Sequence, residues 1–192
     1  MVRFIVRFLI FSTIHSLMAV PGVKIWIGAL LGKWERWYRL GYNLISLALF
    51  VWVMSAWPHP PVIYFIPGIW GLLCYLLQIA AAATLCRCAA QLDLPAFLGI
   101  RPEKSGREAN MLCQDGCYGI IRHPQYTLAV VFLALNPVMT GRWLALTILS
   151  TVYFVIGAWL EEKRLLKEFG DEYRRYRINV PMFLPGLRRS GK

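Results

Sequence analysis

The residues of this chain whose types and spacing suit chemistry stand at the borders of its most apolar segments. Arg122 and His123 come directly before a proline, and Tyr126 follows within one helical turn. Glu161 and Glu162 stand at the end of the next apolar run. A charge beside a hydrophobic segment costs free energy unless water, a partner or a ligand compensates it. An arginine, an imidazole and paired carboxylates could together bind a polar, charged ligand.

Each of these residues also has a simpler structural interpretation. Arg122 could be the basic flank of a membrane span, and His123 could merely begin a helix. The two glutamates precede Lys163 and Arg164 and could belong to a solvated turn. Convergence favours a site, because a helical hairpin over residues 126–160 would return the glutamates to the side of Arg122.

The elements that must position these groups are predicted to be membrane helices. The chain has 192 residues, of which 58% are hydrophobic and 16% charged, whereas about a quarter of a soluble domain is charged. A helix needs roughly 20 mostly apolar residues to cross a bilayer. Apolar runs predict spans near residues 2–20, 40–57, 62–85, 120–139 and 143–160. We therefore expect an all-α fold, a polytopic membrane helical bundle of about five spans in a single domain, 1–192.

The distribution of basic residues predicts the topology. Lys and Arg gather at 24–39, at 87–122 and from residue 163 onward. With five spans these stretches share one side, which the positive-inside rule makes cytoplasmic. The net charge of +11 then reflects topology and attraction to anionic membrane lipids, and we expect no nucleic-acid partner. The first run resembles a signal peptide in its basic start, but it lacks a small-residue cleavage site, so we expect a retained helix.

The connections between the runs differ in length. Consecutive prolines at 57–61 and the sequence at 136–143 predict two tight turns on the outer face. Residues 86–122 form a long, charged, glycine-containing cytoplasmic connection, and loops of this length are often functional. From Glu161 the chain predicts an amphipathic C-terminal helix on the cytoplasmic face.

Five cysteines are present. Cys86, Cys88, Cys113 and Cys117 border the long predicted cytoplasmic connection, where thiols stay reduced. Their spacing is not one of the common zinc patterns. We therefore expect no metal site and interpret the cysteines as incidental.

Two strings of residues resemble the signatures of the isoprenylcysteine carboxyl methyltransferase and phospholipid methyltransferase superfamily of integral membrane enzymes. The first, L-x3-G-x-Y-x3-R-H-P-x-Y, occupies residues 112–126. The second, E-E-x2-L-x3-F-G-x2-Y-x2-Y-x4-P-x3-P, begins at Glu161 and ends at Pro185. The N-terminal strings HSLMAVPGVK and RWYRLGYNLISL are similar to the branch that contains methanethiol S-methyltransferases and NnrU-like proteins.

This resemblance implies an enzyme that binds S-adenosylmethionine at the cytoplasmic side of a membrane, which we expect to be the bacterial inner membrane. The segments 112–126 and 161–187 would enclose the cofactor. Arg122, His123 and Glu162 would be catalytic. The cofactor-binding residues implied by the two signatures are Gly116, Tyr118, Arg122, His123, Tyr126, Glu161, Glu162, Tyr173 and Tyr176.

The implied reaction moves a methyl group from a sulfonium to a lipophilic or small acceptor: a thiol, a carboxylate, an amine or a phospholipid. Such a displacement needs mainly the orientation of its two reactants. Two other interpretations remain open. One is a non-catalytic, NnrU-like membrane accessory protein. The other is an NADPH-dependent sterol-type reductase, whose family shares an R-H-P-x-Y-like string but is normally longer. The sequence leaves the acceptor, a general base and the oligomeric state open.

Overall fold

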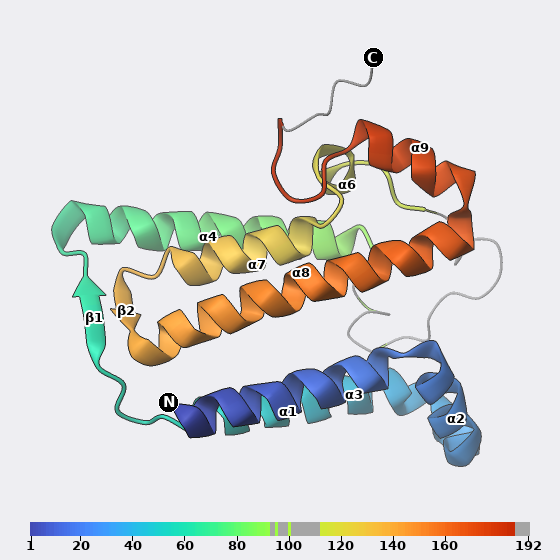
Figure 1. The fold of residues 1–192 in the computed structure, drawn as a ribbon, viewed down its shortest axis with the longest axis horizontal. Helices are drawn as coiled ribbons and strands as arrows, with labels where there is room; N and C mark the ends of the chain where they lie inside the picture. Colours follow the sequence, from blue (N-terminus) through green and yellow to red (C-terminus); the bar gives the residue numbers. More distant parts are fainter. Residues whose placement is uncertain (93–94, 96–99, 101–111, 187–192) are drawn as a thin grey trace. The chain divides into compact units, whose positions relative to one another are not determined.

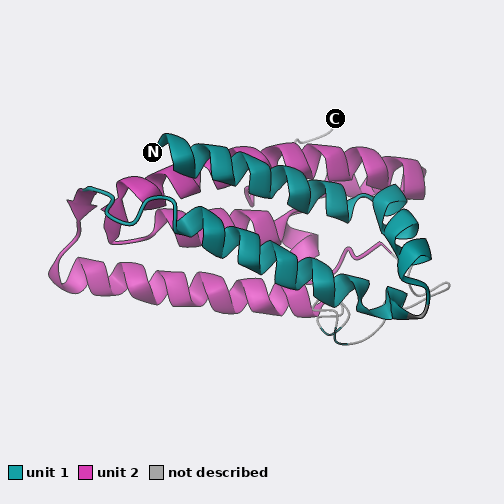
Figure 2. Ribbon diagram, turned by 90° about the horizontal axis from the view of Figure 1, so that it is seen from below, with its two compact units in different colours: residues 1–61, 93–110 teal, residues 62–92, 111–192 magenta. Residues whose placement is uncertain are grey.

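The computed structural model describes residues 1–92, 95, 100 and 112–186. The chain divides into two compact units, which Figure 2 shows in different colours. Unit 1 comprises residues 1–61 and 93–110, and unit 2 comprises residues 62–92 and 111–192. The expectation that residues 1–192 form a single membrane domain stays a prediction.

Unit 1 is a helical hairpin with a bent connection. Its elements are α1 (Val2–Ala19), α2 (Pro21–Leu31), the 3-10 helix η1 (Gly32–Trp37) and α3 (Tyr38–Met54). Helix α1 lies along α3 (Figure 1). Pro21 starts α2 because proline suits the first helical position, where no backbone N–H is needed.

A few polar side chains join α1 to α3. His15 Nδ1 lies 2.9 Å from Ser46 Oγ, and Tyr42 Oη lies 2.8 Å from His15 Nε2. Tyr38 donates a hydrogen bond of 2.6 Å to the carbonyl of Met18. These contacts satisfy groups that would otherwise be costly between apolar helices.

Unit 2 contains the predicted site residues. Its elements are β1 (Val62–Phe65), α4 (Gly68–Ala90), α6 (Cys117–Ile120), α7 (Pro124–Ala134), β2 (Val138–Thr140), α8 (Gly141–Phe169) and α9 (Asp171–Asn179). Helix α7 packs against both α4 and α8, and α6 and α9 lie at the end of these helices away from the two strands (Figure 1).

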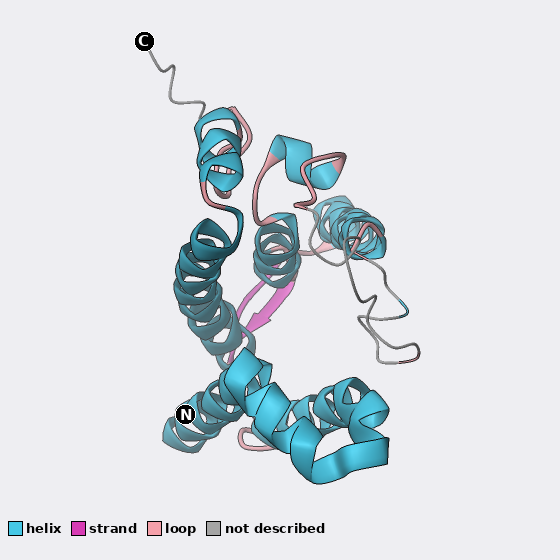
Figure 3. Cartoon of the chain, turned by 90° about the vertical axis from the view of Figure 1, so that its right-hand side faces the viewer, coloured by secondary structure: helices cyan, strands magenta, loops and turns pink. Residues whose placement is uncertain are grey.

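The predicted span at 62–85 is wrong at its start, because Val62–Phe65 form a strand and the helix begins only at Gly68. Strand β1, which follows the predicted turn at 57–61, pairs antiparallel with β2, which lies within the predicted turn at 136–143 (Figure 3). The β-branched Val62 and Ile63 favour a strand, and prolines on either side of it block helix propagation. Two connections far apart in sequence thus satisfy each other's backbone groups.

Two further span boundaries also need correction. The predicted span at 120–139 contains the helix Pro124–Ala134 of 11 residues, because Pro124 starts α7 and the chain enters β2 soon after its end. The predicted span at 143–160 is part of α8, which continues for 29 residues to Phe169. Glu, Lys and Leu between 161 and 169 are good helix formers, so no break separates the apolar part from the charged part.

Three helices of the described residues are long and apolar enough to cross a membrane: α1, α4 and α8. Their apolar side chains are widely exposed; Ile69, Trp70 and Ile79 of α4 are 64–69% exposed. Apolar surface of this extent needs a nonaqueous neighbour. The chain is therefore a largely helical membrane protein, and the predicted number of five spans stays a prediction.

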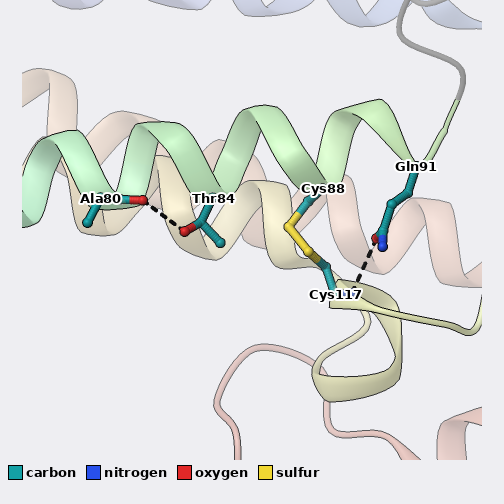
Figure 4. Close-up of a disulfide and its surroundings, with 5 residues drawn as sticks. All are labelled: Ala80, Thr84, Cys88, Gln91 and Cys117. Carbon is teal, nitrogen blue, oxygen red and sulfur yellow. Dashed lines mark hydrogen bonds between the residues drawn. A yellow bond between two sulfur atoms is a disulfide. The ribbon is translucent and has the colours of Figure 1, made fainter.

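The predicted long connection at 86–122 is shorter than expected at both ends, because α4 continues to Ala90 and α6 begins at Cys117. Its charged middle, 101–111, lies outside the described residues. The expectation of reduced, incidental cysteines is wrong for one pair, since a disulfide joins Cys88 to Cys117. The extended α4 brings these two residues to a Cα–Cα distance of 5.7 Å (Figure 4). Cys74, Cys86 and Cys113 are free.

Candidate functional site

The site lies where the start of α7 meets the C-terminal part of α8 and the segment that follows α9. The backbone N–H groups of Arg122 and His123 donate to the carbonyls of Pro181 (2.9 Å) and Met182 (3.1 Å). The hydroxyl of Thr127 donates to the carbonyl of Phe183 at 3.2 Å. The segment 180–183 thereby fixes the backbone from which the Arg122 and His123 side chains project.

Arg122 and Glu162 form a buried ion pair at the centre of the site. Arg122 Nε lies 2.7 Å from Glu162 Oε1, and the two side chains are 9% and 7% exposed. Arg122 Nη1 also donates to the carbonyls of Arg177 and Val180. Of the five N–H groups that a guanidinium carries, three are therefore bonded within the protein.

Glu162 has further basic neighbours. Arg177 Nε lies 3.3 Å from its Oε2, and His123 Nε2 lies 3.5 Å from its Oε1. A carboxylate removed from water is stable only when several groups compensate its charge. Glu162 is thus a buried anion that draws two arginines and the imidazole together.

Glu161 has a different environment, although it is the adjacent residue. Its Oε2 accepts a hydrogen bond of 3.0 Å from the Tyr126 hydroxyl and lies 3.7 Å from His123 Nδ1. Its side chain is 35% exposed, and no Lys or Arg pairs with it among the residues that the structure describes. Successive helix residues point about 100° apart, so the two carboxylates face different surroundings.

Aromatic rings stack beside Glu161. The ring of His123 lies parallel to that of Tyr126 at a centroid distance of 5.4 Å, and Tyr126 stacks on Phe154 at 5.1 Å. The ring of Phe183 is tilted against that of His123 at a centroid distance of 5.7 Å. Phe154 precedes Glu161 by seven residues, which is two helical turns, so heptad spacing could have identified it from the sequence.

The predicted site residues Tyr173 and Tyr176 are nearly buried, with exposures of 1% and 5%. They pack with neighbouring apolar side chains that join α9 to α8: Leu112, Leu165, Leu166, Phe169 and Val180. The Tyr176 hydroxyl donates a hydrogen bond of 2.6 Å to the carbonyl of Tyr118. These tyrosines dock α9 and α6 beside the ion pair.

Burial of these hydroxyls changes their acidity. Desolvation raises the pKa of Tyr176 to about 12 and raises the pKa values of Tyr118 and Tyr173 well above the ordinary value. The Tyr173 hydroxyl and His123 Nε2 are buried without a hydrogen-bond partner among the described residues. Such atoms are unusual in native structures and can mark where a ligand binds.

Gly116 lies at the entrance to α6 rather than beside the ion pair. Its φ is +57°, and a Cβ there would lie 1.9 Å from Gln91 Nε2. Gln91 Oε1 accepts the backbone N–H of Cys117 at 3.2 Å, next to the disulfide (Figure 4). Glycine is needed here because its φ is positive, a backbone conformation that residues with a side chain rarely adopt.

The structure brings together most residues that the sequence predicted for the site. The central cluster holds Arg122, His123, Tyr126, Glu161 and Glu162. Sequence reasoning missed Arg177, Phe154 and Phe183, and it did not distinguish the buried Glu162 from the partly exposed Glu161. Among the described residues, no group of three or more His, Cys, Asp or Glu side chains could hold a metal ion.

A family model described as NnrU protein matches residues 3–177. The chain belongs to the NnrU family. The match covers nearly the whole chain, including the first site segment, the second site segment as far as residue 177, and the helices of unit 1. The resemblance predicted from the sequence is therefore confirmed at the level of the family.

The chain is also similar to proteins named methyltransferases. The chain is 45% identical over 73 residues to methanethiol S-methyltransferase of Pseudomonas deceptionensis, covering 38% of this chain and 28% of that relative. It is 29% identical over 194 residues to methanethiol S-methyltransferase 2 of Bradyrhizobium diazoefficiens, covering 93% and 70%. It is 30% identical over 79 residues to protein-S-isoprenylcysteine O-methyltransferase of Schizosaccharomyces pombe, covering 40% and 34%.

The extent of these alignments differs. The first alignment spans little more than a quarter of the Pseudomonas relative's length, whereas the Bradyrhizobium one spans most of both chains. No solved structure matches the chain significantly.

Proposed function

We propose that this NnrU family protein is an S-adenosylmethionine-dependent membrane methyltransferase. The methyl acceptor is a lipophilic or small molecule with a thiol, carboxylate, amine or phospholipid group. The observation that carries the proposal is the partly exposed Glu161 carboxylate beside the stacked rings of His123 and Tyr126. The relatives named methyltransferases support it.

The residues present fit the cofactor. A sulfonium cation is favoured by aromatic faces and by a carboxylate, and Glu161 supplies a carboxylate without a Lys or Arg partner in the described part of the chain. His123 Nε2 forms no hydrogen bond, although it lies 3.5 Å from Glu162 Oε1, and it can contact a polar part of the ligand. The cofactor supplies an activated methyl group, and the protein contributes binding and orientation, which can lower a barrier by up to about 7–11 kcal/mol.

The roles of the individual residues follow from their contacts. His123, Tyr126 and Glu161 contact the cofactor. Arg122 and Glu162 hold the backbone and the imidazole in place around it, because their charges are already paired with each other. Two outer groups shape the site: Gly116 with Tyr118, and Tyr173 with Tyr176, which dock α6 and α9.

The arrangement in the membrane belongs to the same proposal. Residues 1–192 form one membrane domain of about five spans, with α9 and the site on the cytoplasmic face of a bacterial inner membrane. The three long apolar helices and the basic stretches support this topology. Its partners are the methyl acceptor and membrane lipids, with no nucleic acid.

Calorimetric titration of the detergent-purified protein tests the proposal. We expect saturable binding of S-adenosylhomocysteine and no binding of NADPH. Binding of NADPH alone would indicate a reductase, and binding of neither would indicate a non-catalytic accessory protein.

A carboxylate variant tests the residue that carries the proposal. Glu161→Gln should weaken binding of the cationic S-adenosylmethionine by about fivefold or more and that of the neutral S-adenosylhomocysteine much less, since only the former carries the sulfonium charge. Glu168→Gln, which changes an exposed glutamate of the same helix, is the matched control and should change neither. Equal loss for both ligands would contradict the role of Glu161.

A further inference from the structure

Arg177 has one edge of its guanidinium bound to the protein and the other edge open. It lies near the end of α9, and its Nε contacts Glu162 Oε2 at 3.3 Å. Its side chain is 44% exposed. Neither of its Nη groups has a partner among the described residues, so two parallel N–H directions are available to a ligand.

Arg122 offers much less to a ligand. Its side chain is 9% exposed, its Nε binds Glu162, and its Nη1 binds two carbonyls. Glu162 is one anion shared by Arg122 and Arg177, so the two arginines carry one more positive charge than Glu162 balances. Of the two arginines, Arg177 is the one with both the charge and the geometry to bind an anion.

The open edge of an anchored guanidinium matches a carboxylate. Two N–H groups in one plane bind the two oxygens of a carboxylate in parallel, and this bidentate pairing is stronger than a single hydrogen bond. The contact of Nε with Glu162 holds the plane in position, so less conformational entropy is lost on binding. A lysine would carry the same charge without the fork.

We propose that Arg177, rather than Arg122, binds the carboxylate at the amino-acid end of S-adenosylmethionine. This inference rests on the proposed function and names the residue that recognises one end of the cofactor. Glu161 and Arg177 then form a pair of opposite charge, one for the sulfonium and one for the carboxylate. The two groups of the ligand are separated by a short carbon chain.

Two ligands separate this role from a structural one. S-adenosylhomocysteine carries the amino-acid carboxylate, whereas 5′-methylthioadenosine lacks the whole amino-acid end and keeps the nucleoside and the sulfur. Arg177→Ala should weaken binding of S-adenosylhomocysteine by about tenfold or more, as expected for losing hydrogen bonds to a charged group. Binding of 5′-methylthioadenosine should stay within about twofold. Titration calorimetry of the full chain in detergent measures both.

The same helix provides a matched control. Arg174 is 68% exposed and, among the residues that the structure describes, forms an ion pair only with Asp171, at 3.1 Å. Arg174→Ala therefore removes the same charge from α9 without touching Glu162. It should leave both affinities unchanged. Arg177→Lys keeps the charge and should restore only part of the S-adenosylhomocysteine affinity. Arg177→Gln, which retains more of the side-chain length, replaces the alanine variant if that variant does not fold.

The outcomes distinguish this inference from the proposed function. Equal loss of both ligands in Arg177→Ala would show that Arg177 acts through Glu162, and unchanged binding of both would show that it does not contact the ligand; either overturns the inference alone. A wild-type protein that binds neither ligand overturns the proposed function and the inference with it.

Discussion

The two ends of unit 2 are built by different means. At the strand end, β1 and β2 pair through their backbones, Thr140 accepts the N–H of Trp143, and the Trp143 indole donates to the carbonyl of Leu133 at 2.7 Å. At the other end, buried side chains of opposite charge, Arg122 and Glu162, lie 2.7 Å apart. Backbone and neutral hydrogen bonds are enough to close a helical hairpin. Buried charges are a poor means of stabilising a fold, so the buried Arg122–Glu162 pair indicates that this end serves a ligand.

The largest expected effect comes from removing the charge at the centre of the site. Glu162→Gln leaves Arg122 buried without its carboxylate, and breaking a buried ion pair typically costs roughly 3–5 kcal/mol. The free energy of unfolding in detergent should fall by about that amount, and binding of S-adenosylhomocysteine should be lost. Glu168→Gln is the control, because that side chain is exposed. A loss of less than about 1 kcal/mol would show that the ion pair is not buried in solution.

The second effect concerns the covalent link between α4 and α6. Cys88→Ser opens a disulfide that joins residues 29 apart, and losing such a link costs roughly 2–4 kcal/mol. We expect lower thermal stability. We also expect weaker ligand binding, because Gly116 and Tyr118 are the chain neighbours of Cys117 and would no longer be held against α4. Cys86→Ser changes an exposed free cysteine of the same helix and should have no effect. Equal stability of Cys88→Ser and wild type, before and after treatment with a reductant, would contradict the link.

The third effect tests the strand end of unit 2. Thr140→Ala removes the side-chain cap of α8 and should lower stability by about 1 kcal/mol. Ligand affinity should not change, because Thr140 is at the end of α8 opposite to Glu161 and Glu162. Parallel measurements of thermal unfolding and calorimetric binding check both statements. A variant that is stable but binds weakly would refute the separation of the two ends.

The smallest expected effect is a loss of stability at alkaline pH, caused by a buried tyrosine at the site end of unit 2. Burial raises the pKa of Tyr176 to about 12 in the folded protein, above the ordinary value of about 10. Below about pH 10 the neutral Tyr176 contributes its full stabilisation to the folded protein. This contribution is lost as the pH rises towards 12, because Tyr176 loses its proton at a lower pH in the unfolded chain than in the folded one. Tyr176→Phe should show a shallower loss of stability over this range, measured by thermal unfolding. Tyr118 and Tyr173 shift in the same direction, so some loss should remain in the variant.

Much of the fold and site could be predicted from local sequence patterns. Apolar runs indicated the hairpins, and α1 agrees with its predicted span to within one residue. The two signatures indicated that Arg122 and His123 would meet Glu161 and Glu162. The strands were missed because each is too short to show a periodic pattern, and the pairing of Val62 with Thr140 links positions far apart in the chain.

The sequence by itself determined the membrane character, the helix starts at prolines and the set of residues that could form a site, since these depend on composition and on spacing within one element. The tertiary structure alone decided which carboxylate is paired and which is open, and which arginine keeps a free edge. Those outcomes depend on contacts between residues 40 and 58 positions apart. Adjacent glutamates look alike in a sequence, and the packing of the start of α7 and of α9 against α8 makes their environments, and therefore their chemistry, different.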